Sequence, residues 1–356
     1  MKLFECQHCH QPLYFENTLC ERCGHRLGYM PDPGTMTALE PTETEGVWTA
    51  LAFPGKRFKF CRNAGLDACN WLLEEGAEES HCDACRHNRT IPNLSDAENL
   101  TRWRKLELAK HHLFYTLTNL KLPLRTRAED PEKGLAFDFL SDTVNPDGSV
   151  TTVLTGHADG LITINVAEAD DAERERRRTE MGEPYRTLLG HFRHEIGHYV
   201  WDRLVSEDPA TLERFRALFG DERDDYGEAL KRHYAAGPPA DWQFNYVSGY
   251  AAAHPWEDFA ETWAHYLHIV DTLETARAFG LRIRPRVSEG AELEAEVDFN
   301  PHKARRIEDL IEPWLPLTYA VNSLNRSMGQ PDLYPFILSP AVIEKLGFMN
   351  GLVRAL

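Results

Sequence analysis

Residues 194–198 read His-Glu-Ile-Gly-His, and the surrounding segment has the periodicity of one buried helix. Its apolar side chains recur three and four positions apart, at Leu188, Leu189, Phe192, Ile196, Tyr199, Val200 and Leu204. Residues four apart lie above one another on a helix, so His194 and His198 would point the same way and could hold one Zn²⁺. Glu195 would project beside the metal, where its carboxylate could take a proton from a water molecule. Two core histidines satisfied by carbonyls or water are the structural alternative.

A catalytic zinc needs a third protein ligand and one open coordination position. Trp201 and Leu204 occupy the positions where a metzincin would have glycine and histidine, so that class is excluded. Further along the chain, Pro255 at a first-turn position and the apolar spacing after it predict a second amphipathic helix. Glu257 and Glu261 would share one face of that helix. The best candidates for the third ligand lie in this segment.

The pair Glu257 and Glu261, with Tyr250 seven positions before the first glutamate, resembles the second active-site helix of gluzincin-type zinc peptidases. The resemblance implies that Glu257 is the third ligand and that Glu261 hydrogen-bonds a ligand histidine. It also implies that Tyr250 donates its hydroxyl to the oxyanion of the tetrahedral intermediate. The residues leave alternatives open. The third ligand could instead be Glu261, Asp258 or His254, and the hydroxyl donor could instead be Tyr246. Three further histidines have no motif and are assigned to packing or solvent: His191, His265 and His268.

All eight cysteines precede residue 86, and the first four form two Cys-x-x-Cys pairs. Each pair lets two thiolates bend toward one ion through a tight turn. The four sulfurs would complete a tetrahedron with no open position, so this zinc would be structural. Because the segment has little apolar content, zinc binding would supply most of its folding free energy, on the order of 10 kcal/mol. The predicted ligands are Cys6, Cys9, Cys20 and Cys23.

A second four-cysteine zinc site is predicted from the remaining cysteines, which are Cys61, Cys69, Cys82 and Cys85. One half has the usual two-residue gap, whereas the other half has a seven-residue gap. Either His81 or His87 could replace one of the sulfurs.

The composition limits the partners and the location. The chain of 356 residues carries 39 basic and 56 acidic residues and a formal charge of −17, which disfavours nucleic acid and anionic membranes as partners. No apolar run reaches the length of a membrane span, and no signal-peptide core follows Met1. We expect a cytoplasmic protein, in which cysteines bind metal rather than form disulfides.

The segments around the metal motifs predict helices and a sheet. Ser95 is the expected N-cap of a helix from Asp96 to about Leu120. Short β-branched and aromatic runs within residues 134–166 predict an antiparallel sheet. Residues 161–166 would be its exposed edge strand and could bind an extended peptide by strand addition. The charged run at residues 170–180 is expected to be a solvated helix face or loop.

Taken whole, the chain resembles the bacterial zinc-binding metallopeptidases with an amino-terminal zinc-ribbon domain. The resemblance rests on the paired cysteine groups, residues 194–198, His-Pro-x-Glu-Asp-Phe-Ala-Glu at 254–261 and Gln-Pro-Asp-Leu-Tyr-Pro at 330–335. It implies an α+β fold, with a zinc-ribbon region over residues 1–92 and a zincin-like peptidase domain over residues 93–356. The implied activity is zinc-dependent hydrolysis of peptide bonds with one catalytic and two structural Zn²⁺.

The sequence is also compatible with two functions other than peptide hydrolysis by zinc. In the first, the zinc ribbons recruit a protein partner and the second domain is a scaffold. In the second, the same zinc chemistry hydrolyses an isopeptide or a side-chain amide instead of an ordinary peptide or protein substrate.

Overall fold

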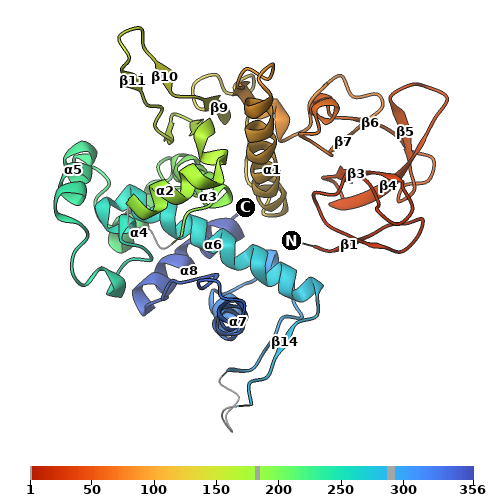
Figure 1. Ribbon diagram of the computed structural model, residues 1–356. Helices are drawn as coiled ribbons and strands as arrows, with labels where there is room; N and C mark the ends of the chain where they lie inside the picture. The colour runs from red at the N-terminus through yellow and green to blue at the C-terminus, as the bar shows by residue number, and fades with distance from the viewer. Residues whose placement is uncertain (1, 181–184, 287–292) are drawn as a thin grey trace. The chain divides into compact units, whose positions relative to one another are not determined.

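The computed structural model describes residues 2–180, 185–286 and 293–356, which form an α+β fold (Figure 1). The chain divides into two compact units, Met1–Arg177 and Arg178–Leu356. The first unit contains the cysteine-rich region together with residues that the sequence prediction placed in the second domain. Among the described residues, no helix combines the length and the apolar character needed to cross a lipid bilayer.

The cysteine-rich region is built from short antiparallel strands. A hairpin of β1 (Phe4–Glu5) and β2 (Pro12–Leu13) precedes a five-stranded meander in which every neighbouring pair is antiparallel. The meander comprises β3 (Arg26–Met30), β4 (Thr35–Pro41), β5 (Val47–Ala50), β6 (Arg57–Phe60) and β7 (Leu72–Glu74). Its small core contains Leu39, Ala50, Phe58 and Leu72. Two 3₁₀ turns, η1 (Arg62–Leu66) and η2 (Cys85–His87), lie beside the second group of cysteines.

Helix α1 (Ala97–Asn119) follows the cysteine-rich region and begins one residue later than predicted. Its N-cap is Asp96, whose carboxylate accepts a hydrogen bond from the backbone N–H of Glu98 at 2.9 Å. The prediction of Ser95 as N-cap was therefore wrong, although Asp is an equally suitable N-cap residue type. Ser95 instead hydrogen-bonds to the side chain of Asn93.

The second sheet of the first unit has the strand order β12-β13-β9-β8. Its strands are β8 (Asn88–Thr90), β9 (Ala136–Leu140), β12 (Gly156–Ala158) and β13 (Leu161–Asn165). Strand β9 is parallel to both β8 and β13, and only β12 and β13 pair in the antiparallel sense. The prediction of an antiparallel sheet was therefore wrong for most of its ladder. Helix α1 connects β8 to β9 as a crossover, which permits a parallel pair.

The predicted edge strand is also corrected, because β13 lies between β12 and β9 and both of its sides are paired. Its backbone cannot accept an added peptide strand. A separate hairpin of β10 (Thr143–Val144) and β11 (Val150–Thr151) precedes β12 in the sequence.

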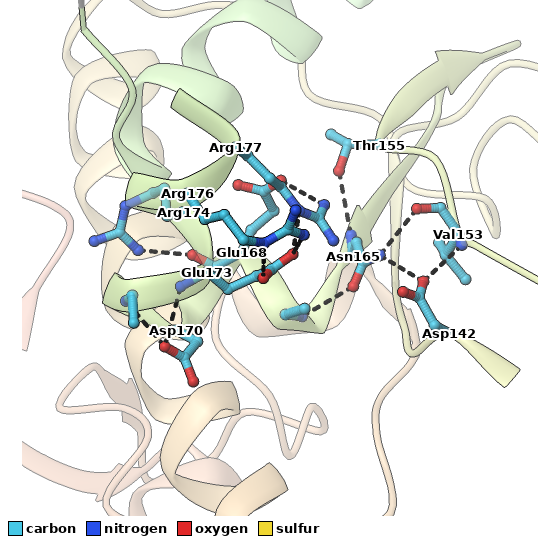
Figure 2. A network of polar contacts seen from close by, with 12 residues as sticks. Asp142, Val153, Thr155, Asn165, Glu168, Asp170, Glu173, Arg174, Arg176 and Arg177 are labelled. Carbon is cyan, nitrogen blue, oxygen red and sulfur yellow. Dashed lines mark hydrogen bonds and ion pairs between the residues drawn. The ribbon is translucent and has the colours of Figure 1, made fainter. Parts of the chain in front are cut away.

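A buried polar network fixes the end of β13 and the start of the charged helix α2 (Asp171–Glu180) (Figure 2). The amide of the fully buried Asn165 donates to the side chain of Asp142 at 2.7 Å and to the carbonyl of Val153 at 2.9 Å. The intervening turn η3 (Val166–Ala169) presents Glu168, whose buried carboxylate pairs with Arg177 of α2 at 2.8 Å. The charged run is thus a helix, and one of its cations, Arg177, forms an ion pair with the buried carboxylate of Glu168.

The second unit is mainly helical and is organised around the central helix α6 (Pro255–Ala278). Helix α6 contacts α3 (Leu188–Leu204), α4 (Pro209–Phe219), α7 (Glu308–Ser327) and α8 (Pro340–Arg354), and Figure 1 shows α7 and α8 beside it. Most of its side chains are buried on all faces. The remaining elements are α5 (Tyr226–Ala236), η4 (Trp242–Phe244), η5 (Tyr250–Ala253), η7 (Pro301–Lys303) and the hairpin of β14 (Arg282–Ile283) and β15 (Ala295–Glu296).

Candidate metal centres

Helix α3 carries His194, Glu195 and His198 in its central turns. It begins at the N-cap Thr187, whose hydroxyl accepts a hydrogen bond from the N–H of Gly190 at 3.0 Å. Glu195 and His198 are buried, and His194 is partly buried. The predicted helix is therefore present, and the side chains of Glu195 and His198 lie in its packed part.

Helix α6 presents Glu257 in its first turn. His254 is the N-cap residue, and its Nδ1 accepts a hydrogen bond from the N–H of Trp256 at 3.1 Å. Pro255 occupies the first turn, where its missing N–H and fixed φ are compatible with a helix start. A carboxylate in this turn also interacts favourably with the positive end of the helix dipole.

A glycine lets these two helices approach closely. A Cβ atom added at Gly197 would lie 2.9 Å from Cα of Ala260 and 3.2 Å from its carbonyl oxygen. The contact is with backbone atoms, which cannot rotate away. The Gly197 position within the pentapeptide therefore brings α3 near enough to α6 for side chains of both helices to meet.

The side chains of His194, His198 and Glu257 converge on one point. Oε2 of Glu257 lies 3.0 Å from Nε2 of His194 and 3.7 Å from Nε2 of His198. All three offer ligand atoms within 4.8 Å of one another. In a tetrahedral zinc site, ligand nitrogen and oxygen atoms about 2.0 Å from the ion would be roughly 3.3 Å apart, which matches this spacing.

The hydrogen bonds around the cluster leave its inner atoms available to a metal. Nδ1 of His194 donates to Oε1 of Glu261 at 2.7 Å, which directs the Nε2 lone pair toward Glu257. Ser248 donates to the other oxygen of Glu261 at 2.6 Å. Oε2 of Glu257 is buried and has no hydrogen-bond partner among the described residues. When His194 is neutral with its proton on Nδ1, its Nε2 lone pair faces this oxygen at 3.0 Å, and a Zn²⁺ ion between the two atoms would bind both, so the donor set fits Zn²⁺.

Tyr226 is a component of this site that the sequence did not predict. Its hydroxyl donates to Oε1 of Glu257 at 2.6 Å. Burial and the nearby carboxylate of Glu257 raise the pKa of Tyr226, so the phenol stays protonated and can donate. Tyr226 lies at the start of α5, thirty-one residues from Glu257, and no local sequence pattern links the two.

Glu195 lies buried beside this cluster. Its carboxylate is buried, and Oε2 has no hydrogen-bond partner in the part of the chain that the structure describes. Burial raises the pKa of Glu195 to about 7, with an opposing effect from His194 and further increases from Glu257 and Glu261. A carboxylate held in this way exchanges a proton more readily near neutral pH than an exposed glutamate does.

Two aromatic side chains border the cluster. The ring of Tyr250 lies 5.9 Å from the ring of His194, measured between centroids. The indole of Trp256 packs against the ring of His198 at a centroid distance of 3.8 Å. Trp256 therefore restricts the rotation of that imidazole, and Tyr250 lies beside the cluster.

The alternatives left open by the sequence have other partners. Asp258 is fully buried and pairs with Lys345 at 2.6 Å. His254 caps α6, and Glu261 hydrogen-bonds to His194. The ring of Tyr246 lies 4.5 Å from the ammonium of Lys345. His265 lies 2.7 Å from the hydroxyl of Tyr334, and His268 contacts Arg193, so both belong to the packed interior.

The first cysteine group forms a compact cluster beside the β1–β2 hairpin. The sulfur of Cys6 lies 3.7 Å from that of Cys23, and the sulfur of Cys9 lies 3.5 Å from that of Cys20. The edge of a tetrahedral four-cysteine zinc site is about 3.8 Å, because each Zn–S bond is about 2.3 Å long. Gly24, which has a positive φ of +76°, lies in the turn after the second Cys-x-x-Cys pair.

The second cysteine group also converges, with all four sulfurs within 4.8 Å of one another. The sulfurs of Cys69 and Cys82 lie 3.7 Å apart. The two histidines proposed as substitute ligands have other contacts: His81 lies 3.1 Å from the hydroxyl of Ser80, and His87 donates to the carbonyl of Leu135 at 2.8 Å.

Comparisons with known proteins place the chain in a family. Residues 99–352 match the model of a family described as "Putative zinc-binding metallo-peptidase", and residues 3–96 match a zinc-ribbon domain. An uncharacterized protein of Mycobacterium bovis and two of Mycobacterium tuberculosis are each 42% identical over 353 residues, which cover 99% of this chain and 95% of each relative. No solved structure matches. The first match spans most of the chain, so the protein belongs to this metallo-peptidase family and carries a zinc-ribbon domain before the peptidase region.

Proposed function

We propose that the protein is a gluzincin-like zinc peptidase that hydrolyses peptide bonds with Glu195 as general base. The observation that carries the proposal is the buried Oε2 of Glu257, which faces Nε2 of His194 and of His198 without a hydrogen-bond partner among the described residues. Glu261 engages the opposite nitrogen of His194. This arrangement is expected of a zinc site with three protein ligands, in which a second carboxylate hydrogen-bonds to one ligand histidine and orients its ring.

Each side chain of the site would have a separate role. Zinc held by His194, His198 and Glu257 would supply a Lewis acid that polarises the scissile carbonyl and acidifies a water molecule. Glu195 would accept the proton of that water and pass it to the leaving amine. Tyr250 would donate its hydroxyl to the oxygen that gains negative charge.

The test is the Glu195→Gln substitution in the full chain. Gln is nearly isosteric with Glu but cannot act as a base, so we expect the zinc content to stay at the wild-type value while peptide cleavage falls about 10²- to 10⁴-fold. A peptide library read by mass spectrometry supplies the assay, and the exposed Glu344→Gln on α8 is the matched control. Cleavage at the wild-type rate by the Glu195→Gln protein would refute the base assignment.

Three zinc ions per chain follow from this proposal, one catalytic and two structural. Native mass spectrometry of the full chain measures this count directly. The substrate class, with isopeptides and side-chain amides as the rivals, stays a prediction. A protein partner of the zinc ribbons and a cytoplasmic location are likewise predictions from the sequence.

A further inference from the structure

A histidine of helix α1 lies against the second cysteine group. Nε2 of His111 is 3.2 Å from the sulfur of Cys69, 3.6 Å from that of Cys85 and 3.9 Å from that of Cys82. His111 is buried, 42 residues from Cys69 in the sequence. The four sulfurs and this nitrogen thus give five cysteine and histidine donor atoms, whereas a tetrahedral zinc ion takes four.

The separations match those of a ligand. With a Zn–S bond of about 2.3 Å and a Zn–N bond of about 2.0 Å, a tetrahedral site places nitrogen and sulfur roughly 3.5 Å apart. The three distances from His111 scatter around that value, and the distance of 3.7 Å between the sulfurs of Cys69 and Cys82 fits the other edge of the tetrahedron.

The orientation of the imidazole also suits metal binding. Nδ1 of His111 donates to the backbone carbonyl of Glu107 at 2.6 Å. A carbonyl oxygen only accepts, so Nδ1 carries the proton and the lone pair of the neutral ring lies on Nε2, toward the sulfurs. Trp71 packs against the ring at a centroid distance of 5.3 Å and limits its movement. A histidine fixed through its second nitrogen in this way is typical of metal ligands.

Charged neighbours of the cluster are already paired. The buried carboxylate of Glu107 bonds to the ammonium of Lys110 at 2.7 Å, and its other oxygen lies 3.4 Å from the sulfur of Cys85. The Cys61 sulfur accepts from the N–H of Cys82 at 3.4 Å. Three cysteines of the second group, Cys69, Cys82 and Cys85, have their sulfurs near Nε2 of His111. Cys61 is the fourth member of that group.

We propose that zinc in the second site is held by Cys69, Cys82 and Cys85, and that Cys61 and His111 compete for the fourth position. Either residue completes a tetrahedral set. The histidine alternative ties the zinc-ribbon segment to α1, which begins the segment matched by the peptidase family, and both lie within the first compact unit. The inference requires a metal at the second cysteine site and does not depend on peptidase activity.

The experiment uses the full chain loaded with ¹¹³Cd²⁺, because cadmium NMR gives each site its own resonance and the shift moves as sulfur ligands are replaced. In Cys61→Ser we expect the second-site signal at the position of three sulfurs and one nitrogen. In His111→Gln we expect it at the position of four sulfurs. The double variant, which lacks both candidates, should lose the signal or show three sulfurs and one oxygen.

Zinc content after a chelator challenge gives the second measurement. Cys61→Ser and His111→Gln should each retain the wild-type zinc count, whereas Cys69→Ser and the double variant should lose one ion per chain. The proposal is overturned if Cys61→Ser loses its zinc as readily as Cys69→Ser does, or if its cadmium signal coincides with that of the double variant. The signals of the first cysteine site and of the His194 site should be unchanged throughout, which shows that the chain is folded.

Discussion

The hydroxyl of Tyr226 donates a 2.6 Å hydrogen bond to Oε1 of Glu257, and the other oxygen of that carboxylate faces the two imidazoles of α3. The bond holds the carboxylate in the orientation in which one oxygen can bind a metal. Tyr226 comes from α5 and Glu257 from α6, so the packing of two helices determines how the proposed third ligand is oriented.

Tyr226→Phe should weaken zinc binding at the His194 site by about 10- to 100-fold, the usual effect of removing a group that orients a metal ligand. Competition with a chelator of known affinity measures this change. Tyr234→Phe is the control, since Tyr234 lies on the same helix and is 67% exposed. Equal zinc affinities in the two variants would show that Glu257 does not need this hydrogen bond.

Tyr250→Phe should lower kcat by about 10²- to 10³-fold and leave both the zinc content and KM near their wild-type values, because an oxyanion donor acts in the transition state. Tyr246→Phe is the matched control and also tests the alternative donor, whose ring packs on Lys345. If Tyr246→Phe shows the larger loss of kcat, the two assignments must be exchanged.

Gly197→Ala should destabilise the second unit by about 1–3 kcal/mol, because the new methyl group meets the backbone of Ala260 at 2.9 Å. The two helices must then separate, so we also expect weaker zinc binding. Gly347→Ala in α8 is the control: its methyl group would make only an ordinary contact with Ile307 at 3.4 Å, and alanine is the better helix former. The apparent Tm should fall in the first variant and stay constant or rise in the second.

His157 should make the first unit sensitive to mild acid. Burial lowers the pKa of His157 to about 4, with a smaller opposing effect from Asp159 and a further decrease from Arg127. Its Nε2 accepts a hydrogen bond from the N–H of Gly160 at 3.0 Å, which requires the neutral ring. The unfolded chain binds the proton more readily, so this contribution is complete above about pH 6.5 and is lost as the pH falls toward 4.

The partial exposure of His157 limits this contribution to roughly 2 kcal/mol. Urea unfolding at pH 7.5 and pH 5 measures it in the wild type and in His157→Asn, in which an amide oxygen can accept the same hydrogen bond without titrating. Both proteins lose zinc-linked stability in acid, so only the difference between them reports on His157. Identical pH profiles would contradict the assignment.

The sequence by itself determined the elements that depend on local chemistry. The spacing of His194 and His198 on one helix and the paired cysteines follow from neighbouring residues, because helical periodicity and short metal-binding turns are local properties. The helix that presents Glu257 was likewise found from Pro255 and the apolar spacing after it.

Only the tertiary structure decided which distant residues lie beside the candidate sites and how the strands pair. Tyr226 reaches Glu257, and His111 reaches Cys69, through contacts between segments 31 and 42 residues apart. Strand β13 pairs in parallel with β9, from which β10, β11 and β12 separate it in the sequence, and a run of apolar residues carries no information about that direction. The amino-acid pattern specifies which face of an element is buried, whereas the packing of the whole chain selects the partner that covers it.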